Sequence, residues 1–195
     1  MSSIESEAEP SHPGYDWEDL RVISSTDELA ALFHPLREQL VDLLLERAAT
    51  VGELAEAVGR PPSTVAYHVK RLVAAGLVKV VRTRRVRAIE ERSYGRTARV
   101  FYVGSITPDQ QTSIPNYLHA AAAESSAAHH DDELRAMLRY ARIPEEQAEV
   151  FWQQVLDLVA EFSALPRTGS RTYALVAGLY PADHVALPPE DPTGR

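Results

Sequence analysis

The stretch VGELAEAVGRPPSTVAYHVKRLVAAGLVKVVRTRRVRAIEERSYGRTARVFY, residues 51–102, decides the fold. Its first eight residues, 51–58, carry apolar side chains at helical spacing, and Gly59 suits the C-terminal cap of that helix. Pro61 and Pro62 then interrupt the chain, which predicts a turn. The opening of this stretch therefore predicts a short helix followed by a tight turn.

A second helix and a hairpin follow the turn. Ser63 can cap the new helix, and Gly76 ends it. The inward side of this helix is predicted to consist of Val65, Val69, Leu72 and Val73. Residues 77–103 are rich in Val, Ile, Tyr and Arg, which predicts a β-hairpin with its tip near Arg84 and Arg85. The order helix, turn, helix, hairpin predicts a winged helix-turn-helix, a fold that can present polar side chains to a DNA major groove.

Basic residues are concentrated in this same part of the chain. The whole chain has a formal net charge of −8. Residues 60–99 contain eleven basic residues and only two acidic ones, Glu90 and Glu91. This window therefore has a net charge of +9, and the remainder of the chain has a net charge of −17. The basic residues are Arg60, Lys70, Arg71, Lys79, Arg82, Arg84, Arg85, Arg87, Arg92, Arg96 and Arg99. A basic stripe in an acidic protein indicates a polyanionic partner, and double-stranded DNA fits the predicted fold.

Composition excludes several other classes of protein. The chain has 195 residues, of which 45% are hydrophobic, as in an ordinary globular protein. It has no cysteine, which excludes disulfides, zinc–thiolate sites and cysteine nucleophiles. No apolar run approaches the roughly 20 residues that span a membrane, and the acidic first residues do not resemble a signal peptide. We therefore expect a cytoplasmic protein with no membrane partner.

Four segments are expected along the chain. Residues 1–15 are predicted to be a disordered acidic tail, and residues 16–104 the winged helix-turn-helix domain. Residues 105–186 form a C-terminal region that could hold a dimer interface, an effector site or both, and residues 187–195 form a loose, Pro-containing tail. The predicted fold class is α+β, mainly α, with a C-terminal extension of helices and strands.

Three features are predicted ahead of the helix-turn-helix. Residues 16–23 could dock as a short extended piece. Ser25, followed by two acidic residues, indicates the start of a helix. Pro35 breaks this helix at His34 and suits the first turn of the next one.

The C-terminal region gives a mixed pattern. Residues 108–128 are rich in Ala and are predicted to be helical. A helix is predicted to begin at Pro144 and to run to about Leu165, and residues 172–180 are predicted to form a buried strand. Residues 133–143 fit either a helix or a strand, and we favour a strand because the residue before Pro144 must be extended.

Four short motifs occur together and in order between residues 25 and 103, about 40% of the chain. They are His34-Pro35-Leu36-Arg37, Thr50-Val51-Gly52-Glu53-Leu54-Ala55, Ser63-Thr64-Val65-Ala66-Tyr67-His68-Val69-Lys70-Arg71-Leu72 and Ala75-Gly76-Leu77-Val78. This part of the chain resembles the ArsR-like winged-helix transcriptional regulators. The resemblance implies a dimeric repressor of transcription whose DNA binding is modulated by an effector. The effector could be an unknown small molecule, and we expect no cofactor. The metal-binding cysteine pair of many family members has no counterpart in this chain.

Ten residues are candidates for DNA contact. On the second helix they are Ser63, Thr64, Tyr67, His68, Lys70 and Arg71, and on the hairpin Arg82, Arg84, Arg85 and Arg87. The resemblance implies base or phosphate contacts from the helix; the alternative is a solvated face, with His68 packed on the neighbouring helix. The hairpin arginines suit phosphate contacts, or else a strand edge protected by charge. Because side chains alternate along a strand, about half of these arginines can face DNA at once.

The spacing of His119, His130 and Glu133 raises the question of a metal site. On one continuous helix, eleven residues make about three turns, so both histidines would share a face. Some metal-sensing ArsR-like proteins use this spacing with an Asp two residues before the first His, where this chain has Tyr117. A metal-responsive regulator is kept as an alternative, but we expect no tight metal site.

No catalytic constellation is present, so we expect no enzyme. A winged helix can also serve as a protein–protein interaction module. A wing that binds another protein does not need a window with a net charge of +9. The apolar segments Leu29–Leu45 and Val150–Leu165 offer more non-polar surface than one small wing domain can bury, which predicts a homodimer.

Overall fold

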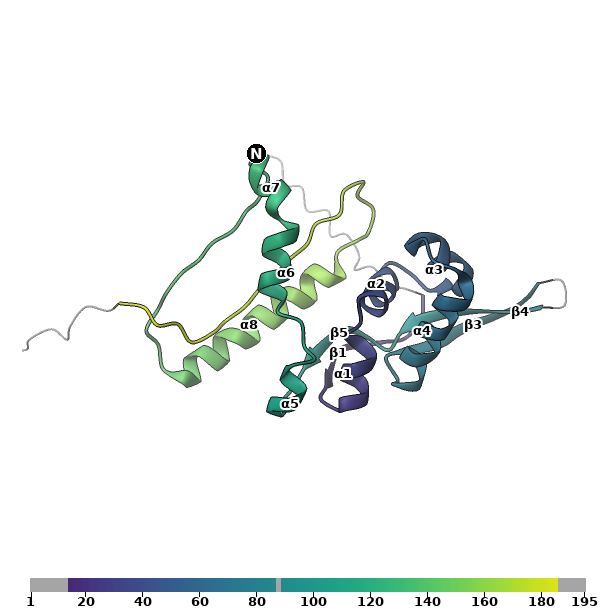
Figure 1. The fold of residues 1–195 in the computed structure, drawn as a ribbon, viewed down its shortest axis with the longest axis horizontal. Coiled ribbons are helices and arrows are strands. Elements are labelled where there is room, and N and C mark those ends of the chain that lie inside the picture. Colours follow the sequence, from purple (N-terminus) through teal and green to yellow (C-terminus); the bar gives the residue numbers. More distant parts are fainter. Residues whose placement is uncertain (1–13, 87–88, 186–195) are drawn as a thin grey trace, which may run out of the picture. The chain divides into compact units, whose positions relative to one another are not determined.

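The computed structural model describes residues 14–86 and 89–185 (Figure 1). Most of the predicted acidic tail 1–15, the wing residue Arg87 and the predicted tail 187–195 lie outside the described residues. The predicted domain boundaries remain predictions. Within the described ranges, no helix is long and apolar enough to cross a membrane.

Four helices build the predicted winged domain. They are α1 (Thr26–Leu32), α2 (Pro35–Leu43), α3 (Val51–Val58) and α4 (Pro62–Ala74). Ser25 and Thr50 each begin a helix with a capping box, in which the hydroxyl accepts from a backbone N–H three residues on and a glutamate there accepts in return. Gly59 ends α3 with a φ of 61°, the left-handed conformation that glycine adopts without a steric penalty. The predicted starts of α1, α2 and α3, the break at His34 and the end of α3 at Gly59 are confirmed.

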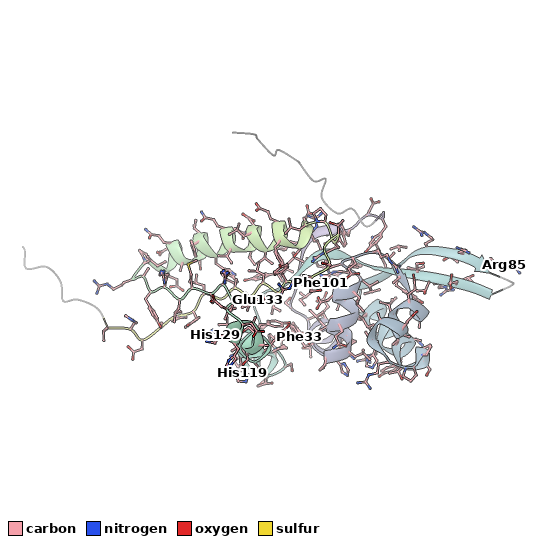
Figure 2. All side chains as sticks on the ribbon, turned by 90° about the horizontal axis from the view of Figure 1, so that it is seen from above. Phe33, Arg85, Phe101, His119, His129 and Glu133 are labelled. Carbon is pink, nitrogen blue, oxygen red and sulfur yellow. The ribbon has the colours of Figure 1, made fainter. Side chains whose placement is uncertain are left out.

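The wing is a long antiparallel hairpin. Strand β3 (Val78–Val86) pairs with β4 (Ile89–Arg96), and β4 also pairs with the two-residue strand β2 (Ala49–Thr50). The register shifts between Val80 and Arg82, which marks a bulge in the lower part of the hairpin. Figure 2 shows Arg85 at the far end of this hairpin. The predicted β-hairpin is confirmed; Arg84 and Arg85 are paired residues near the end of its strands, and residues 87–88 between the strands lie outside the described residues.

One core holds the helices against the sheet. Leucine and valine side chains from α1, α2, α3 and α4 meet residues at the start of β3 and β5. The largest fully buried side chains are Ile23, Leu29, Leu40, Leu44, Leu54, Leu72, Leu77, Val65, Val69 and Val78. Because this core lies between the helices and the base of the wing, it fixes α4 relative to the hairpin.

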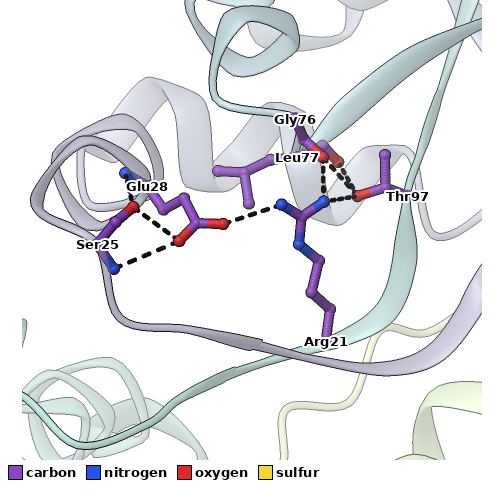
Figure 3. Close-up of polar contacts among 6 residues, drawn as sticks. All are labelled: Arg21, Ser25, Glu28, Gly76, Leu77 and Thr97. Carbon is purple, nitrogen blue, oxygen red and sulfur yellow. Dashed lines mark hydrogen bonds and ion pairs between the residues drawn. The ribbon is translucent and has the colours of Figure 1, made fainter.

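The extended piece predicted at residues 16–23 forms β1 (Glu18–Ile23), which pairs in parallel with β5 (Ala98–Val103). Arg21 connects this strand to the rest of the domain (Figure 3). Its guanidinium donates to the Gly76 carbonyl at 2.6 Å and to the Glu28 carboxylate at 2.9 Å. The same Glu28 closes the capping box of α1, so one arginine joins β1, the start of α1 and the end of α4.

The C-terminal region contains four helices among its described residues. They are α5 (Pro108–Gln111), α6 (Tyr117–Glu124), α7 (Ser126–His130) and α8 (Glu145–Ala164). The helix predicted from Pro144 is confirmed as α8. By contrast, residues 133–143 and 172–180 run without strand pairing, so the predicted strands are wrong for this structure. A strand needs a hydrogen-bonded neighbour, and neither segment has one among the described residues.

The chain divides into two compact units. One contains residues 14–116 and 157–174, and the other contains residues 117–156 and 175–185. No side chain described between residues 105 and 185 is buried, whereas the first unit holds the whole core named above. The stability of the described molecule therefore resides in the winged domain.

Candidate nucleic-acid interface

Helix α4 has one buried side and one solvent side. Val65, Val69 and Leu72 are buried, as predicted, but Val73 is 37% exposed and lies outside the core. The helix also begins two residues earlier than a Ser63 cap predicts. Pro61 is the N-cap and Pro62 the first helical residue, because proline already has a helical φ and loses no hydrogen bond there. Ser63 therefore lies inside the first turn and does not cap the helix.

The solvent side of α4 carries most of the candidate DNA contacts. Ser63, Lys70 and Arg71 are exposed, Tyr67 is 59% exposed, and Thr64 is partly buried at the edge. At 100° per residue, Ser63, Tyr67 and Lys70 fall within about 60° of one another. The sequence thus places a hydroxyl, a phenol and a cation on one strip of this helix.

His68 lies on the other side. Only 8% of it is exposed, because its position on α4 is adjacent to Val65 and Leu72. Its Nδ1 atom is 3.3 Å from the Nη1 atom of Arg37, a residue that is also buried. Since a guanidinium can only donate, Nδ1 must accept and the imidazole proton sits on Nε2. Of the two interpretations of His68, the structure favours packing on the neighbouring helix.

The first resemblance motif explains why Arg37 is there. His34 begins α2, and its Nδ1 accepts from the backbone N–H of Leu36 at 3.2 Å. Arg37 then donates to the carbonyls of Ala30 and Ala31 at the end of α1. The rings of His34 and His68 lie 4.7 Å apart between centroids. These contacts connect α1 and α2 to α4 and set the angle at which α4 presents its solvent side.

Burial changes the proton affinity of this cluster. Burial lowers the pKa of His68 below its usual value, and the neighbouring His34 and Arg37 lower it further. The imidazole is therefore neutral at neutral pH, consistent with accepting a hydrogen bond from Arg37.

A concavity lies beside the start of α4. Its volume is about 390 Å³. The lining residues are His34, Pro35, Leu36, Gln39, Arg60, Pro61 and Thr64. Because it is open to solvent and carries a guanidinium and a hydroxyl, it extends the polar surface of α4 toward α2.

The wing alternates cations with anions. In the β3–β4 register, Arg84 lies opposite Glu91 and Arg85 opposite Glu90. Glu90 forms an ion pair with Arg92 at 2.7 Å. Both glutamates of the basic window thus sit in the wing, and they offset part of its positive charge.

Three predicted wing contacts are exposed in the structure: Arg82, Arg84 and Arg85. None of them forms an ion pair with another residue of the described ranges. Arg82 and Arg84 share one face of the hairpin and Arg85 occupies the other, because side chains alternate. A straight DNA backbone on one side of the wing could therefore contact either this pair or Arg85.

The base of the wing is rigidly held. The Tyr15 hydroxyl accepts from the backbone N–H of Arg96 at 2.9 Å, and its ring packs where a Gly95 side chain would stand. The Arg96 guanidinium is buried and donates to the carbonyls of Val41, Ala98 and Arg99. No local pattern in the sequence predicts a structural role for Tyr15 or Arg96. They anchor the lower end of the hairpin to α2 and β5.

The three metal candidates do not form one site in the structure. His119 lies on α6 and His130 on α7, and the chain turns between these helices near Ser125. The continuous helix that would align both histidines is therefore interrupted. Among residues 14–86 and 89–185, no group of three or more His, Cys, Asp or Glu side chains could hold a metal ion.

Helices α2, α3 and α4 lie in a segment that matches a known protein family. Residues 32–81 match the model of a family described as a helix-turn-helix domain. The chain contains a helix-turn-helix domain. The match runs from the end of α1, through α3 and α4, into β3. With the hairpin that follows, the predicted α+β winged helix-turn-helix fold is confirmed.

Solved structures similar to this chain include proteins of Mycobacterium bovis, Vibrio cholerae and Xylella fastidiosa. The homodimeric winged helix-turn-helix DNA-binding domain Mb0332 of Mycobacterium bovis, a possible ArsR-family transcriptional regulator, is 23% identical, with 53% of this chain and 82% of that chain covered and a TM-score of 0.32. HlyU of Vibrio cholerae is 23% identical, with 50% and 89% covered and a TM-score of 0.32. The transcriptional repressor BigR of Xylella fastidiosa is 26% identical, with 56% and 87% covered and a TM-score of 0.31. Comparison with curated proteins gives no match.

Proposed function

We propose that this chain is a sequence-specific DNA-binding transcriptional regulator that acts as a homodimer, of the ArsR-like repressor type. The observation that carries the proposal is the solvent side of α4, where Ser63, Tyr67 and Lys70 share one strip. A helix that enters the major groove places such side chains against base edges. The wing supplies exposed arginines that suit phosphates. As a DNA-binding regulator it would act in the cytoplasm.

The ArsR-like type is supported by what the four motifs do. His34 and Arg37 contact His68, so the first motif orients the third. The second motif forms α3 behind its Thr50 cap, and the fourth carries the chain from α4 into the wing at Gly76. The resemblance thus concerns residues that position the DNA-contacting helix as well as residues that would contact DNA.

A gel-shift with the chain's own upstream DNA tests the proposal. We expect a specific complex that competing unrelated DNA displaces only weakly. Replacing Tyr67 with Ala should cost about 1–3 kcal/mol of specific binding, the usual value of a good base contact. If unrelated DNA competes as well as the upstream DNA does, sequence-specific binding is excluded.

The wing is tested by salt dependence. Replacing Arg84 and Arg85 with Ala should weaken binding to all sequences alike. It should also make the slope of log affinity against log salt shallower by about 0.9 for each phosphate that the wing no longer neutralises. The matched control replaces two exposed arginines outside the wing, Arg135 and Arg139, with Ala. An unchanged slope in the wing variant would remove the wing from the contact surface.

A protein–protein interaction module is the other class of function. With this function, the arginines of the wing would not bind a polyanion. The winged domain should then show no salt-dependent binding to DNA, because no phosphates are neutralised. The same salt titration therefore separates the two functions.

A further inference from the structure

Arg37 and His68 form a polar contact inside the winged domain, where α2 packs on the helix proposed to enter the major groove. Only 8% of each residue is exposed, and the Nη1 atom of Arg37 lies 3.3 Å from Nδ1 of His68. A neutral imidazole accepts this hydrogen bond, whereas an imidazolium carries a proton on both ring nitrogens and cannot accept it. One proton therefore converts this contact from an attractive one into a repulsive one.

The guanidinium of Arg37 cannot move away from a protonated His68 without losing its other contacts. Its Nε and Nη2 atoms donate to the carbonyls of Ala31 and Ala30, the second at 2.6 Å. Both carbonyls belong to the last turn of α1, where the negative end of the helix dipole favours a cation. Because Arg37 is anchored to α1, relief of the repulsion must come from His68 and the helix that carries it.

The charged and titratable groups around this contact come from α2 and α4. His34 begins α2, and its ring lies 4.7 Å from the ring of His68 between centroids. Burial and then Arg71, on α4, lower the pKa of Arg37, and Tyr67 opposes this shift. Three of these four neighbours are cations or can become cations, so a proton on His68 enters a cluster that already disfavours positive charge.

His68 adjoins the surface that would contact bases. Its ring makes an edge contact with the ring of Tyr67, with centroids 5.2 Å apart, and Tyr67 is 59% exposed on the solvent side of α4. At the radius of about 5–6 Å of a helix with its side chains, a rotation of about 20° moves side-chain ends by about 2 Å. A displacement of this size is enough to break a hydrogen bond to a base edge.

We propose that His68 is a positioning residue for DNA recognition: α4 presents its solvent side correctly to the bases only while the imidazole is neutral and accepts from Arg37. Acidification then lowers the affinity for specific DNA more than the affinity for unrelated DNA, because base contacts need an exact placement of α4 and carry the specificity, whereas phosphate contacts do not depend on sequence. This inference rests on the proposed function and adds a dependence of its specificity on pH.

The direction of the effect follows from proton linkage. Burial lowers the pKa of His68 below 6.5, and His34 and Arg37 lower it further, so the imidazole is neutral in the folded chain at neutral pH. If the specific complex excludes the proton, its formation releases one proton from each protonated His68. The specific affinity is then highest above about pH 6.5, and it falls by up to about tenfold per pH unit for each chain below the pKa of the free chain.

The test compares two duplexes of equal length, the upstream DNA and an unrelated sequence, in gel-shifts of the full chain at a series of pH values. Between about pH 7.5 and about pH 5, the ratio of the two affinities should fall by about tenfold or more for wild type. His68→Gln keeps an acceptor for Arg37 but does not titrate, so its ratio should change little. His129→Gln removes an exposed histidine of the other compact unit and should respond to pH as wild type does.

His34→Asn provides a shift that a merely structural role of His68 does not produce. Asparagine accepts at a helix N-cap, so α2 keeps its cap while the second imidazole beside His68 is removed. Removing a neighbouring cation and part of the cover of His68 raises the pKa of His68. The loss of specificity should therefore begin at a higher pH than in wild type, and a midpoint that stays in place or moves to lower pH contradicts the inference.

Nuclear magnetic resonance of the His68 ring measures the linkage directly, in the free chain and in the complex with the upstream DNA. A polyanion near an imidazole raises its pKa, because it stabilises the charged form. Here the opposite is expected: by reciprocity, a complex that is weakened by the proton must itself lower the pKa of His68. A pKa of His68 that rises on binding the upstream DNA overturns the positioning role.

The remaining outcomes separate this inference from the proposed function. A wild-type affinity ratio that does not change with pH, or a His68→Gln ratio that falls as steeply as that of wild type, overturns the inference and keeps the regulator. Far-ultraviolet circular dichroism is recorded at each pH, because loss of the helices where specificity is lost would mean that acid unfolds the domain, which also overturns the inference. Equal binding of the two duplexes already at neutral pH overturns the proposed function, and the inference with it.

Discussion

At the scale of single residues, two buried arginines hold backbone carbonyls inside the winged domain. Arg37 donates hydrogen bonds to carbonyls at the end of α1, and Arg96 donates hydrogen bonds to carbonyls of α2 and β5. Burial lowers the pKa of Arg96 to about 10, so the guanidinium is still charged at neutral pH. It also lies 4.7 Å from the centre of the Phe101 ring, a favourable cation–π position. A buried cation of this kind is stable only because its donors are satisfied.

Replacing Arg96 with Met should therefore destabilise the fold. The carbonyls of Val41, Ala98 and Arg99 would lose a charged donor in a dry environment. We expect the free energy of unfolding to fall by about 3 kcal/mol, measured by urea denaturation. Arg82→Met, at an exposed wing position, should change it by less than about 0.5 kcal/mol. Equal losses in the two variants would refute the role of Arg96.

His68 gives the fold a dependence on pH. Burial, His34 and Arg37 keep its folded-state pKa below the unfolded value of about 6.5. The unfolded chain then binds the proton first, so stability from this residue is present above about pH 6.5 and is lost as the pH falls below it. His68→Gln retains an acceptor for Arg37 but cannot be protonated. Between pH 7 and pH 5, wild type should lose more stability than this variant in urea denaturation; parallel curves would show that His68 does not contribute.

The buried positions of Arg37 and His68 can be predicted from sequence to different extents. Arg37 stands four residues before Val41 and three before Leu40, so it occupies the apolar stripe of α2, and a charged residue there is a signal of an internal partner. The identity of that partner, His68, depends on how α2 crosses α4, which no local pattern contains. Only the position of His68 beside Val65 and Leu72 predicted that it could pack inward.

At the scale of elements, β1 is held to the domain by its parallel pairing with β5 and by Arg21. The Arg21–Glu28 pair is mostly shielded from solvent, with 28% and 19% of the two side chains exposed. The pair Arg47–Glu53 has the same N–O distance of 2.9 Å, but 62% and 44% of its side chains are exposed. The two pairs therefore offer a matched comparison.

Replacing Arg21 with Ala should reduce the free energy of unfolding by about 1–2 kcal/mol, because Gly76 and Glu28 both lose a charged donor. Arg47→Ala should cost less than about 0.5 kcal/mol, since exposed ion pairs are screened by solvent. Urea denaturation of both variants measures the difference. Similar losses would show that Arg21 behaves as an ordinary surface residue.

Several elements whose limits are set by local chemistry were predicted correctly from sequence, although Ser63 does not cap α4 as predicted. Capping boxes, the His34–Pro35 break and Gly59 specify where helices start and stop, whatever surrounds them. Residues 133–143 and 172–180 show the limit of this approach. Their alternating or continuous apolar residues favour a strand, but a strand also needs a neighbour, and the described chain supplies none.

At the scale of the whole molecule, charge and apolar surface are separated along the chain. The basic window of residues 60–99 lies in the winged domain, whereas the rest of the chain carries −17. No residue beyond position 104 is buried among those the structure describes. In the proposed dimer, the first part contacts DNA and the second part joins the copies, so the affinity for DNA depends on both.

A two-fold dimer of winged domains predicts the form of its operator. One recognition helix contacts too few bases for tight specific binding, so each copy should occupy one half-site. The two α4 helices, Pro62–Ala74, should enter successive major grooves about 34 Å apart. We therefore expect an imperfect inverted repeat with half-site centres about 10 base pairs apart, or a small multiple of that spacing.

Footprinting on the upstream DNA measures this spacing. Inserting about five base pairs between the half-sites should abolish tight binding, because it moves one half-site to the opposite side of the duplex, and inserting about ten should restore part of it. Protection of a single asymmetric half-site by a monomer would contradict the dimer while leaving the helix-turn-helix domain intact. Insensitivity to the insertions would mean that the two copies are joined too loosely to impose a spacing, and would contradict a two-fold dimer that holds its α4 helices at a fixed separation.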